Sequence, residues 1–426
     1  MASFRFWHVG GNSSAIRHSG LFVLYQLVGR RYGRIQQALG VFDLGKDPDR
    51  LHDVCSKFLQ DWERGMFRYI ASRYDRKNVR RSLDRQKRIE HRAIPFRFDD
   101  SFALRTISEA ENFFEPSGAD VPLVEETGRV VFRSDIQGND EKNNTFECLI
   151  SDSGSKRHAL VVFHHWYARS RYPAFSKFFA SRGITIVEAT LPFHFDRASD
   201  KFSEEKLLNA DLGVTVGSLR QAVLDGRKIV RWLHAQGYSE ISVVGMCIGG
   251  LIAGLIASYE HKVSKAILMV SPDGLADMVW TGETFRGLRA RLESSISLEE
   301  LRNAWRLFDL RKNLWELSRP GLDLMFVVGK DDKIVRPEVS GGLIGDLGAC
   351  NLPPQVTRLN CGHSSVGMFP YNIIAARRVL RFLKETPTLA ELWEMRGFRY
   401  DFSETQMKPT MWNRLSSAAL RKHLDS

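Results

Sequence analysis

The segment VVGMCIGG, residues 243–250, decides the fold of this chain. A β-branched run leads into it, and small and aliphatic residues follow from 251 to 257. This pattern predicts a strand, a sharp turn and a helix, with Cys247 on the turn. A side chain on such a turn needs very small neighbours two positions away, and Gly245 and Gly249 occupy both positions.

The cysteine on this turn has two interpretations. A helix N-terminus favours negative charge, which suits a thiolate, so Cys247 is a candidate nucleophile. Taken alone, the same letters also fit a glycine-rich turn with a buried, inert thiol, because free cysteine is often a core residue. Segments further along the chain favour the nucleophile.

Two later strand patterns end in residues that could serve a nucleophile. Residues 324–328 form an apolar run typical of a buried strand, and Asp331 and Asp332 follow it. Residues 356–360 predict another strand, which runs into His363. Nucleophile, acid and histidine therefore follow predicted strands in that order along the chain.

With these motifs the chain resembles the α/β-hydrolase superfamily over roughly residues 120–386. The resemblance implies an α/β fold with a mostly parallel central sheet flanked by helices. It also implies that Cys247 is the nucleophile, His363 the base and Asp332 the orienting acid. Two alternative acids remain, Asp331 and, after the preceding strand, Asp273.

The same resemblance implies two backbone donors for an oxyanion. One is the N–H of Ile248, directly after the nucleophile, and the other follows the strand at 159–163. Family members usually carry His-Gly there and donate from the next residue, which in this chain is Trp166. His165 replaces the glycine, so this chain departs from the family pattern at the second donor.

The cysteine in the elbow is similar to that of dienelactone-hydrolase-like enzymes and of polyhydroxyalkanoate synthases, which share Gly-x-Cys-x-Gly-Gly. The resemblance implies a hydrolase that cleaves an ester or thioester through a Cys-His-Asp triad and an acyl-cysteine intermediate. One alternative is an acyltransferase that moves the acyl group from a thioester carrier to an alcohol, an amine or a growing polyester. Another is a non-catalytic member whose basic N-terminal region binds a partner or a membrane.

Charge is distributed unevenly along the 426 residues. The net charge is +11, and residues 1–100 hold 20 Lys and Arg against 11 Asp and Glu. This excess suits a solvated helix face, an anionic lipid surface or the phosphates of an acyl carrier such as coenzyme A or a carrier protein. We expect no nucleic acid, because no known nucleic-acid module accompanies the charge. The cations cluster at Arg76, Lys77, Arg80, Arg81, Arg85, Lys87 and Arg88.

Three parts are expected. Residues 1–118 form a basic helix-rich extension, 119–386 the hydrolase core with a helical cap insertion at about 275–320, and 387–426 a tail that docks on the core. Five scattered cysteines show neither a disulfide framework nor metal-ligand spacing, which predicts a cytoplasmic protein with no metal and no cofactor. The strongest apolar run, residues 21–28, is far shorter than a membrane-spanning helix, which needs about 20 residues. Peripheral contact with a membrane stays an open alternative.

Overall fold

The computed structural model describes residues 66–90, 112–117, 120–350 and 353–385. Most of the predicted extension and the whole predicted tail therefore lie outside the described residues. Within them, one sheet of nine strands forms the centre of the fold. The strands are β1 (Val124–Glu126), β2 (Arg129–Arg133), β3 (Thr145–Ser151), β4 (His158–Phe163), β5 (Thr185–Ala189), β6 (Glu240–Met246), β7 (Lys265–Met269), β8 (Asp323–Gly329) and β9 (Gln355–Leu359).

The strand order is β1-β2-β3-β5-β4-β6-β7-β8-β9. The first three strands are antiparallel hairpin partners, and β3 pairs antiparallel with β5. From β5 onward all neighbours are parallel. Apart from the added edge strand β1, this order and direction are those of the α/β-hydrolase fold, and the predicted fold class is confirmed.

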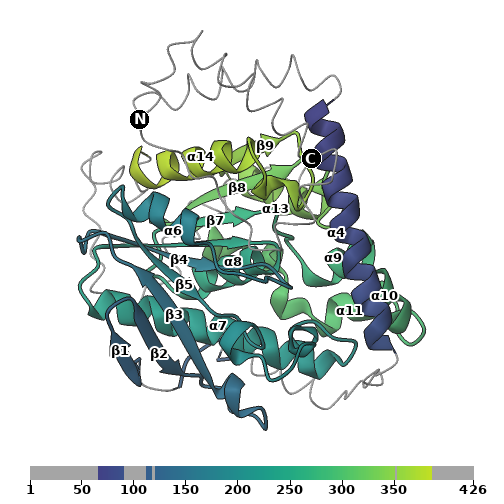
Figure 1. The fold of residues 1–426 in the computed structure, drawn as a ribbon, viewed down its shortest axis with the longest axis horizontal. Helices are drawn as coiled ribbons and strands as arrows, with labels where there is room; N and C mark the ends of the chain where they lie inside the picture. Colours follow the sequence, from purple (N-terminus) through teal and green to yellow (C-terminus); the bar gives the residue numbers. More distant parts are fainter. Residues whose placement is uncertain (1–65, 91–111, 118–119, 351–352, 386–426) are drawn as a thin grey trace, which may run out of the picture. The chain divides into compact units, whose positions relative to one another are not determined.

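Helices cover both faces of the sheet (Figure 1). The α-helices are α4 (Met66–Glu90), α6 (Pro173–Ala180), α7 (Leu212–Ala235), α8 (Ile248–Tyr259), α9 (Leu275–Thr281), α10 (Arg286–Leu292), α11 (Leu298–Ala304), α12 (Leu314–Leu317), α13 (Pro337–Ala349) and α14 (Tyr371–Glu385). The 3-10 helices are η2 (Glu141–Asn144), η3 (Phe195–Arg197), η4 (Ser203–Lys206), η5 (Glu283–Phe285), η6 (Arg306–Phe308), η7 (Leu310–Asn313) and η8 (Ser365–Gly367).

The central strands are apolar throughout because both of their faces are covered. Every residue of β4 is buried, and its side chains alternate between two core clusters. Val161 packs with α7 and α8 on one face, whereas Leu160 and Val162 pack with α6 and α14 on the other. Because the strands from β5 to β9 are parallel, the loops after their carboxyl ends lie along one edge of the sheet.

The segment between β7 and β8 is helical, as the sequence predicts for residues 275–320. It holds α9, α10, α11 and α12, and its large side chains Trp305 and Phe308 are buried. Whether these helices act as a cap stays a prediction. One strand, β1, was not expected from the sequence, because its three residues include two exposed glutamates. Among the described helices, none combines the length and the apolar character needed to cross a bilayer.

Candidate active site

Cys247 lies at the sharp turn between β6 and α8. Its backbone has φ 57° and ψ −123°, a conformation that residues with a side chain rarely adopt. A Cβ on Gly245 would lie 1.9 Å from the Gly249 carbonyl oxygen, and a Cβ on Gly249 would lie 2.4 Å from that of His164. Both glycines are therefore required for the turn, and the second also lets α8 begin directly against the end of β4.

His363 and Asp332 meet at the same edge of the sheet, in the loops after β9 and β8. The Nδ1 atom of His363 lies 2.8 Å from Oδ2 of Asp332, and both side chains are buried. The other carboxylate oxygen, Oδ1, accepts hydrogen bonds from the backbone N–H groups of Ile334 at 2.8 Å and Val335 at 2.9 Å. Both carboxylate oxygens are therefore occupied, which fixes the carboxylate and, through it, the imidazole ring.

The third predicted residue, Cys247, also contacts the imidazole. Burial lowers the pKa of His363, but the carboxylate of Asp332 and the nearby Cys247 side chain outweigh burial and hold that pKa well above its usual value. His363 therefore holds a proton firmly beside the Cys247 thiol.

The two alternative acids make hydrogen bonds to other residues, Asp331 through its backbone and Asp273 through its carboxylate. The backbone N–H of Asp331 donates to the carbonyl of Cys361 at 3.0 Å. Asp273 accepts a hydrogen bond from the Leu343 N–H at 3.3 Å, and burial raises its pKa to about 7. Of the three candidate acids, Asp332 is the one whose hydrogen bond to His363 the structure records.

The two predicted oxyanion donors come from the start of α8 and from the loop after β4. Ile248 is the first residue of α8, where a backbone N–H has no acceptor within its own helix. Trp166 follows β4 in a turn closed by the Ala168 N–H and the His165 carbonyl at 3.2 Å. Its indole donates to the Glu204 carbonyl at 2.7 Å, which anchors the ring. Donation from the Trp166 backbone stays a prediction.

A tyrosine that the sequence did not indicate joins this group. The Tyr172 hydroxyl and Nδ1 of His165 are 2.6 Å apart. Burial raises the pKa of Tyr172 and lowers that of His165 to about 4, so both groups are neutral near pH 7. His363 is near enough to lower the pKa of His165, and Cys247 near enough to raise that of Tyr172. The histidine that replaces the family's glycine therefore brings a second, neutral polar pair to the site.

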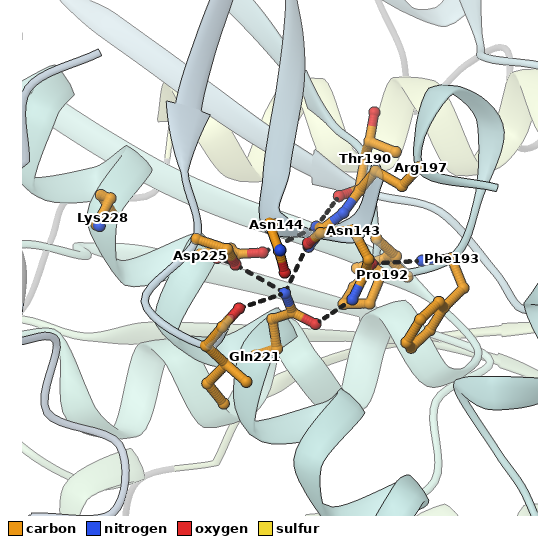
Figure 2. A network of polar contacts seen from close by, with 12 residues as sticks. Asn143, Asn144, Thr190, Pro192, Phe193, Arg197, Gln221, Asp225 and Lys228 are labelled. Carbon is orange, nitrogen blue, oxygen red and sulfur yellow. Dashed lines mark hydrogen bonds and ion pairs between the residues drawn. The ribbon is translucent and has the colours of Figure 1, made fainter. Parts of the chain in front are cut away.

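The loop after β5, residues 190–197, is held by a buried ion pair between its last residue and α7 (Figure 2). Arg197 is 0% exposed, and its Nη1 lies 2.8 Å from Oδ2 of Asp225 on α7. The same guanidinium donates to the carbonyls of Thr190 at 3.1 Å and Asn143 at 2.9 Å. The Asn143 side chain in turn accepts from the Phe193 N–H at 3.0 Å. The loop is therefore tied at both ends and in its middle.

Comparisons with known proteins add little to this geometry. No family model matches the chain. Two proteins from two strains of Mycobacterium tuberculosis, both described as uncharacterized, are 31% identical over 121 residues. That match covers 28% of this chain and 27% of each relative. The chain thus matches about a quarter of the length of these curated relatives.

Several solved structures follow a similar path. An acetyl xylan esterase from Paenibacillus sp. R4 is 15% identical with a TM-score of 0.48, covering 69% of this chain and 98% of that one. An esterase from Pyrococcus furiosus is 18% identical with a TM-score of 0.42, covering 56% and 86%. An acylaminoacyl peptidase from Pyrococcus horikoshii is 12% identical with a TM-score of 0.45, covering 57% and 40%. By the order and direction of its own strands, this chain has the α/β-hydrolase fold, with a cysteine at the strand-to-helix elbow.

Proposed function

We propose that the chain is a hydrolase that cleaves an ester or thioester through Cys247, His363 and Asp332. The observation that carries the proposal is the His363 imidazole, whose Nδ1 lies 2.8 Å from Oδ2 of Asp332 and which is near enough to the elbow cysteine for Cys247 to raise its pKa. A buried imidazole between a fixed carboxylate and a thiol on a strained turn is what nucleophilic catalysis by cysteine needs.

In the first step the Cys247 sulfur, its proton held by His363, attacks the acyl carbonyl carbon. A C–S bond forms, and the carbonyl π electrons move to oxygen, where the N–H of Ile248 and the backbone after β4 would donate to the oxyanion. The electrons return, the bond to the alkoxide or thiolate leaving group breaks, and His363 gives that group its proton. An acyl-cysteine thioester remains.

In the second step His363 takes a proton from water, and the resulting hydroxide attacks the thioester carbonyl. The C–S bond breaks, the carboxylic acid leaves, and Cys247 recovers its proton from His363. Asp332 is needed in both steps, because its hydrogen bond to Nδ1 of His363 directs the other ring nitrogen, Nε2, toward the Cys247 thiol.

The test is intact-protein mass spectrometry after mixing the chain with a panel of activated esters and acyl thioesters. We expect a mass gain of one acyl group that is absent in Cys247→Ala and retained in Cys350→Ala, since Cys350 is an exposed cysteine and serves as the matched control. An adduct that persists in Cys247→Ala, or no adduct and no turnover with any substrate, contradicts the proposal.

The same experiment separates hydrolysis from acyl transfer. A hydrolase loses the adduct in water alone, at a rate that alcohols and amines change little. An acyltransferase holds the adduct in water and loses it when an acceptor is added. Full biological activity in Cys247→Ala would instead favour a non-catalytic binding protein.

A further inference from the structure

Helix α4 belongs to the segment predicted to be a basic extension, yet it contacts the loop that carries His363. Asp75, near its middle, is the contact. Oδ1 of Asp75 accepts from the backbone N–H groups of Ser364 and Ser365, each at 2.9 Å. Oδ2 accepts from the Ser365 hydroxyl at 2.7 Å. One carboxylate thus receives three donors from the two residues after His363.

The residue before His363 belongs to the same arrangement. The Gly362 N–H donates to the Ser365 hydroxyl oxygen at 2.9 Å. A Cβ at Gly362 would lie 2.4 Å from Oδ2 of Asp75, so the close approach of the two segments requires a glycine there. Ser365 itself is fully buried. Without Asp75, the backbone N–H groups of Ser364 and Ser365 would lose their acceptor. A buried N–H without an acceptor destabilises the folded chain.

A second residue fixes α4 ten positions later, about 15 Å along the helix axis. Arg85 donates to the Lys201 carbonyl at 2.7 Å and to Oε2 of Glu204 at 2.6 Å. Its guanidinium also lies over the Tyr167 ring, 4.6 Å from the centroid. From the sequence, Arg85 is one of the cations that suit a solvated face, an anionic lipid surface or phosphates, and the structure turns its side chain inward instead.

Core contacts hold the helix as well. Ala71 is buried in the core cluster that contains α14, and α4 contacts η5, α10 and η8. In Figure 1 the helix, drawn in purple, runs from the end of β9 past α9 to α10. Helix α4 is thus held by two side chains and by core contacts, and Asp75 is placed at the histidine loop by the whole helix.

We propose that Asp75 is a positioning residue that holds the turn 362–365 and thereby keeps the His363 imidazole beside Cys247. This inference rests on the proposed function, since it gives that function a fourth side chain. Asp332 orients the imidazole ring through Nδ1, whereas Asp75 fixes the backbone from which the ring projects. The two carboxylates act on different parts of the same residue.

The test uses the alkylation of Cys247 by iodoacetamide, which needs no substrate. Peptide mapping by mass spectrometry separates Cys247 from the exposed Cys350. We expect Asp75→Ala to slow alkylation of Cys247 about tenfold near pH 7, because a misplaced imidazole no longer supports the thiolate. Asp84→Ala is the matched control, since Asp84 is an exposed aspartate of the same helix, and we expect the wild-type rate.

Asp75→Asn keeps the proposal testable if the alanine variant fails to fold. An amide oxygen still accepts the two backbone N–H groups, and the Ser365 hydroxyl can turn to the Gly362 carbonyl, 3.3 Å away. We therefore expect Asp75→Asn to fold and to alkylate within about threefold of wild type. Near-wild-type alkylation of Cys247 in Asp75→Asn, together with slow alkylation in Asp75→Ala, supports positioning through hydrogen bonds.

His363→Ala separates the two proposals. If His363→Ala slows alkylation and a folded Asp75→Ala does not, the role of Asp75 is refuted and the catalytic proposal stands. If His363→Ala alkylates at the wild-type rate, His363 does not activate Cys247, and both proposals fail.

Discussion

The replacement Arg197→Met tests whether the loop after β5 depends on its buried ion pair. Methionine fills a similar volume but cannot donate, so the Asp225 carboxylate loses its ion-pair partner at 2.8 Å and the Thr190 carbonyl loses its donor. The Asn143 carbonyl loses one of two donors and keeps that of Gln221 at 2.8 Å. Removing one partner of a buried pair costs about 3–5 kcal/mol, because the other charge stays buried and unpaired. At about 2–4 °C per kcal/mol for a domain of roughly this size, the melting temperature should fall by about 6–20 °C.

The pH dependence of this loss follows from Asp225. Burial already raises the pKa of Asp225, and Arg197 acts in the opposite direction. Without Arg197 the folded-state pKa of Asp225 rises further above its unfolded value. A raised folded-state pKa gives stability that is present below the unfolded pKa and is lost as pH rises through the folded pKa. The deficit of Arg197→Met relative to wild type should therefore grow from pH 5 to pH 8.

The assay is thermal unfolding followed by circular dichroism at pH 5 and pH 8, for wild type, Arg197→Met and Arg197→Met/Asp225→Asn. We expect the double variant to recover more than half of the loss at pH 8, because no buried charge is left without a partner. A melting temperature of Arg197→Met within 2 °C of wild type, by the same estimate under about 1 kcal/mol, would refute the reasoning. A loss of melting temperature in Arg197→Met that is the same at pH 5 and pH 8 would refute it as well.

Two further predictions concern the elbow and the acid. Gly245→Ala should abolish soluble expression, because its Cβ would meet the Gly249 backbone at 1.9 Å, whereas Gly341→Ala on α13, with no atom within 4 Å of the new Cβ, should raise stability by about 0.5–1 kcal/mol. A soluble Gly245→Ala protein with a wild-type melting curve would show that the turn is not constrained as described. Asp332→Asn should slow acylation of Cys247 about 1,000-fold or more in stopped-flow measurements, because an amide can donate to Nδ1 and hold the wrong tautomer. Asp273→Asn is the matched comparison and should leave acylation unchanged; if it is the slower of the two, Asp273 is the acid.

Local patterns were enough to predict the fold. The run 243–250 and the strands at 324–328 and 356–360 each combine a buried apolar stretch with a turn, so the sheet edge could be located from neighbouring residues alone. Asp332 and His363 follow such strands directly.

Contacts between distant segments could not be predicted in this way. Asp75 is one acid in a basic stretch, and nothing in its neighbours indicates a partner 290 residues further along the chain. Arg85 looks like any exposed cation until the helix is packed and its side chain meets Glu204. The buried pair of Arg197 and Asp225 likewise depends on how α7 lies against the loop after β5.

The contact between Asp75 and Ser365 also determines when the candidate site can form during synthesis. Its 290-residue separation means that α4 leaves the ribosome long before the turn that it supports. At about 5–20 residues per second, roughly 15–60 s pass between the two events. The sheet from β1 to β8 can form in that interval, but the candidate site cannot, because Asp75 and His363 come together only after β9 has been made. A nascent chain thus carries the elbow cysteine without the histidine that would activate it while the residues between Cys247 and His363 are being made.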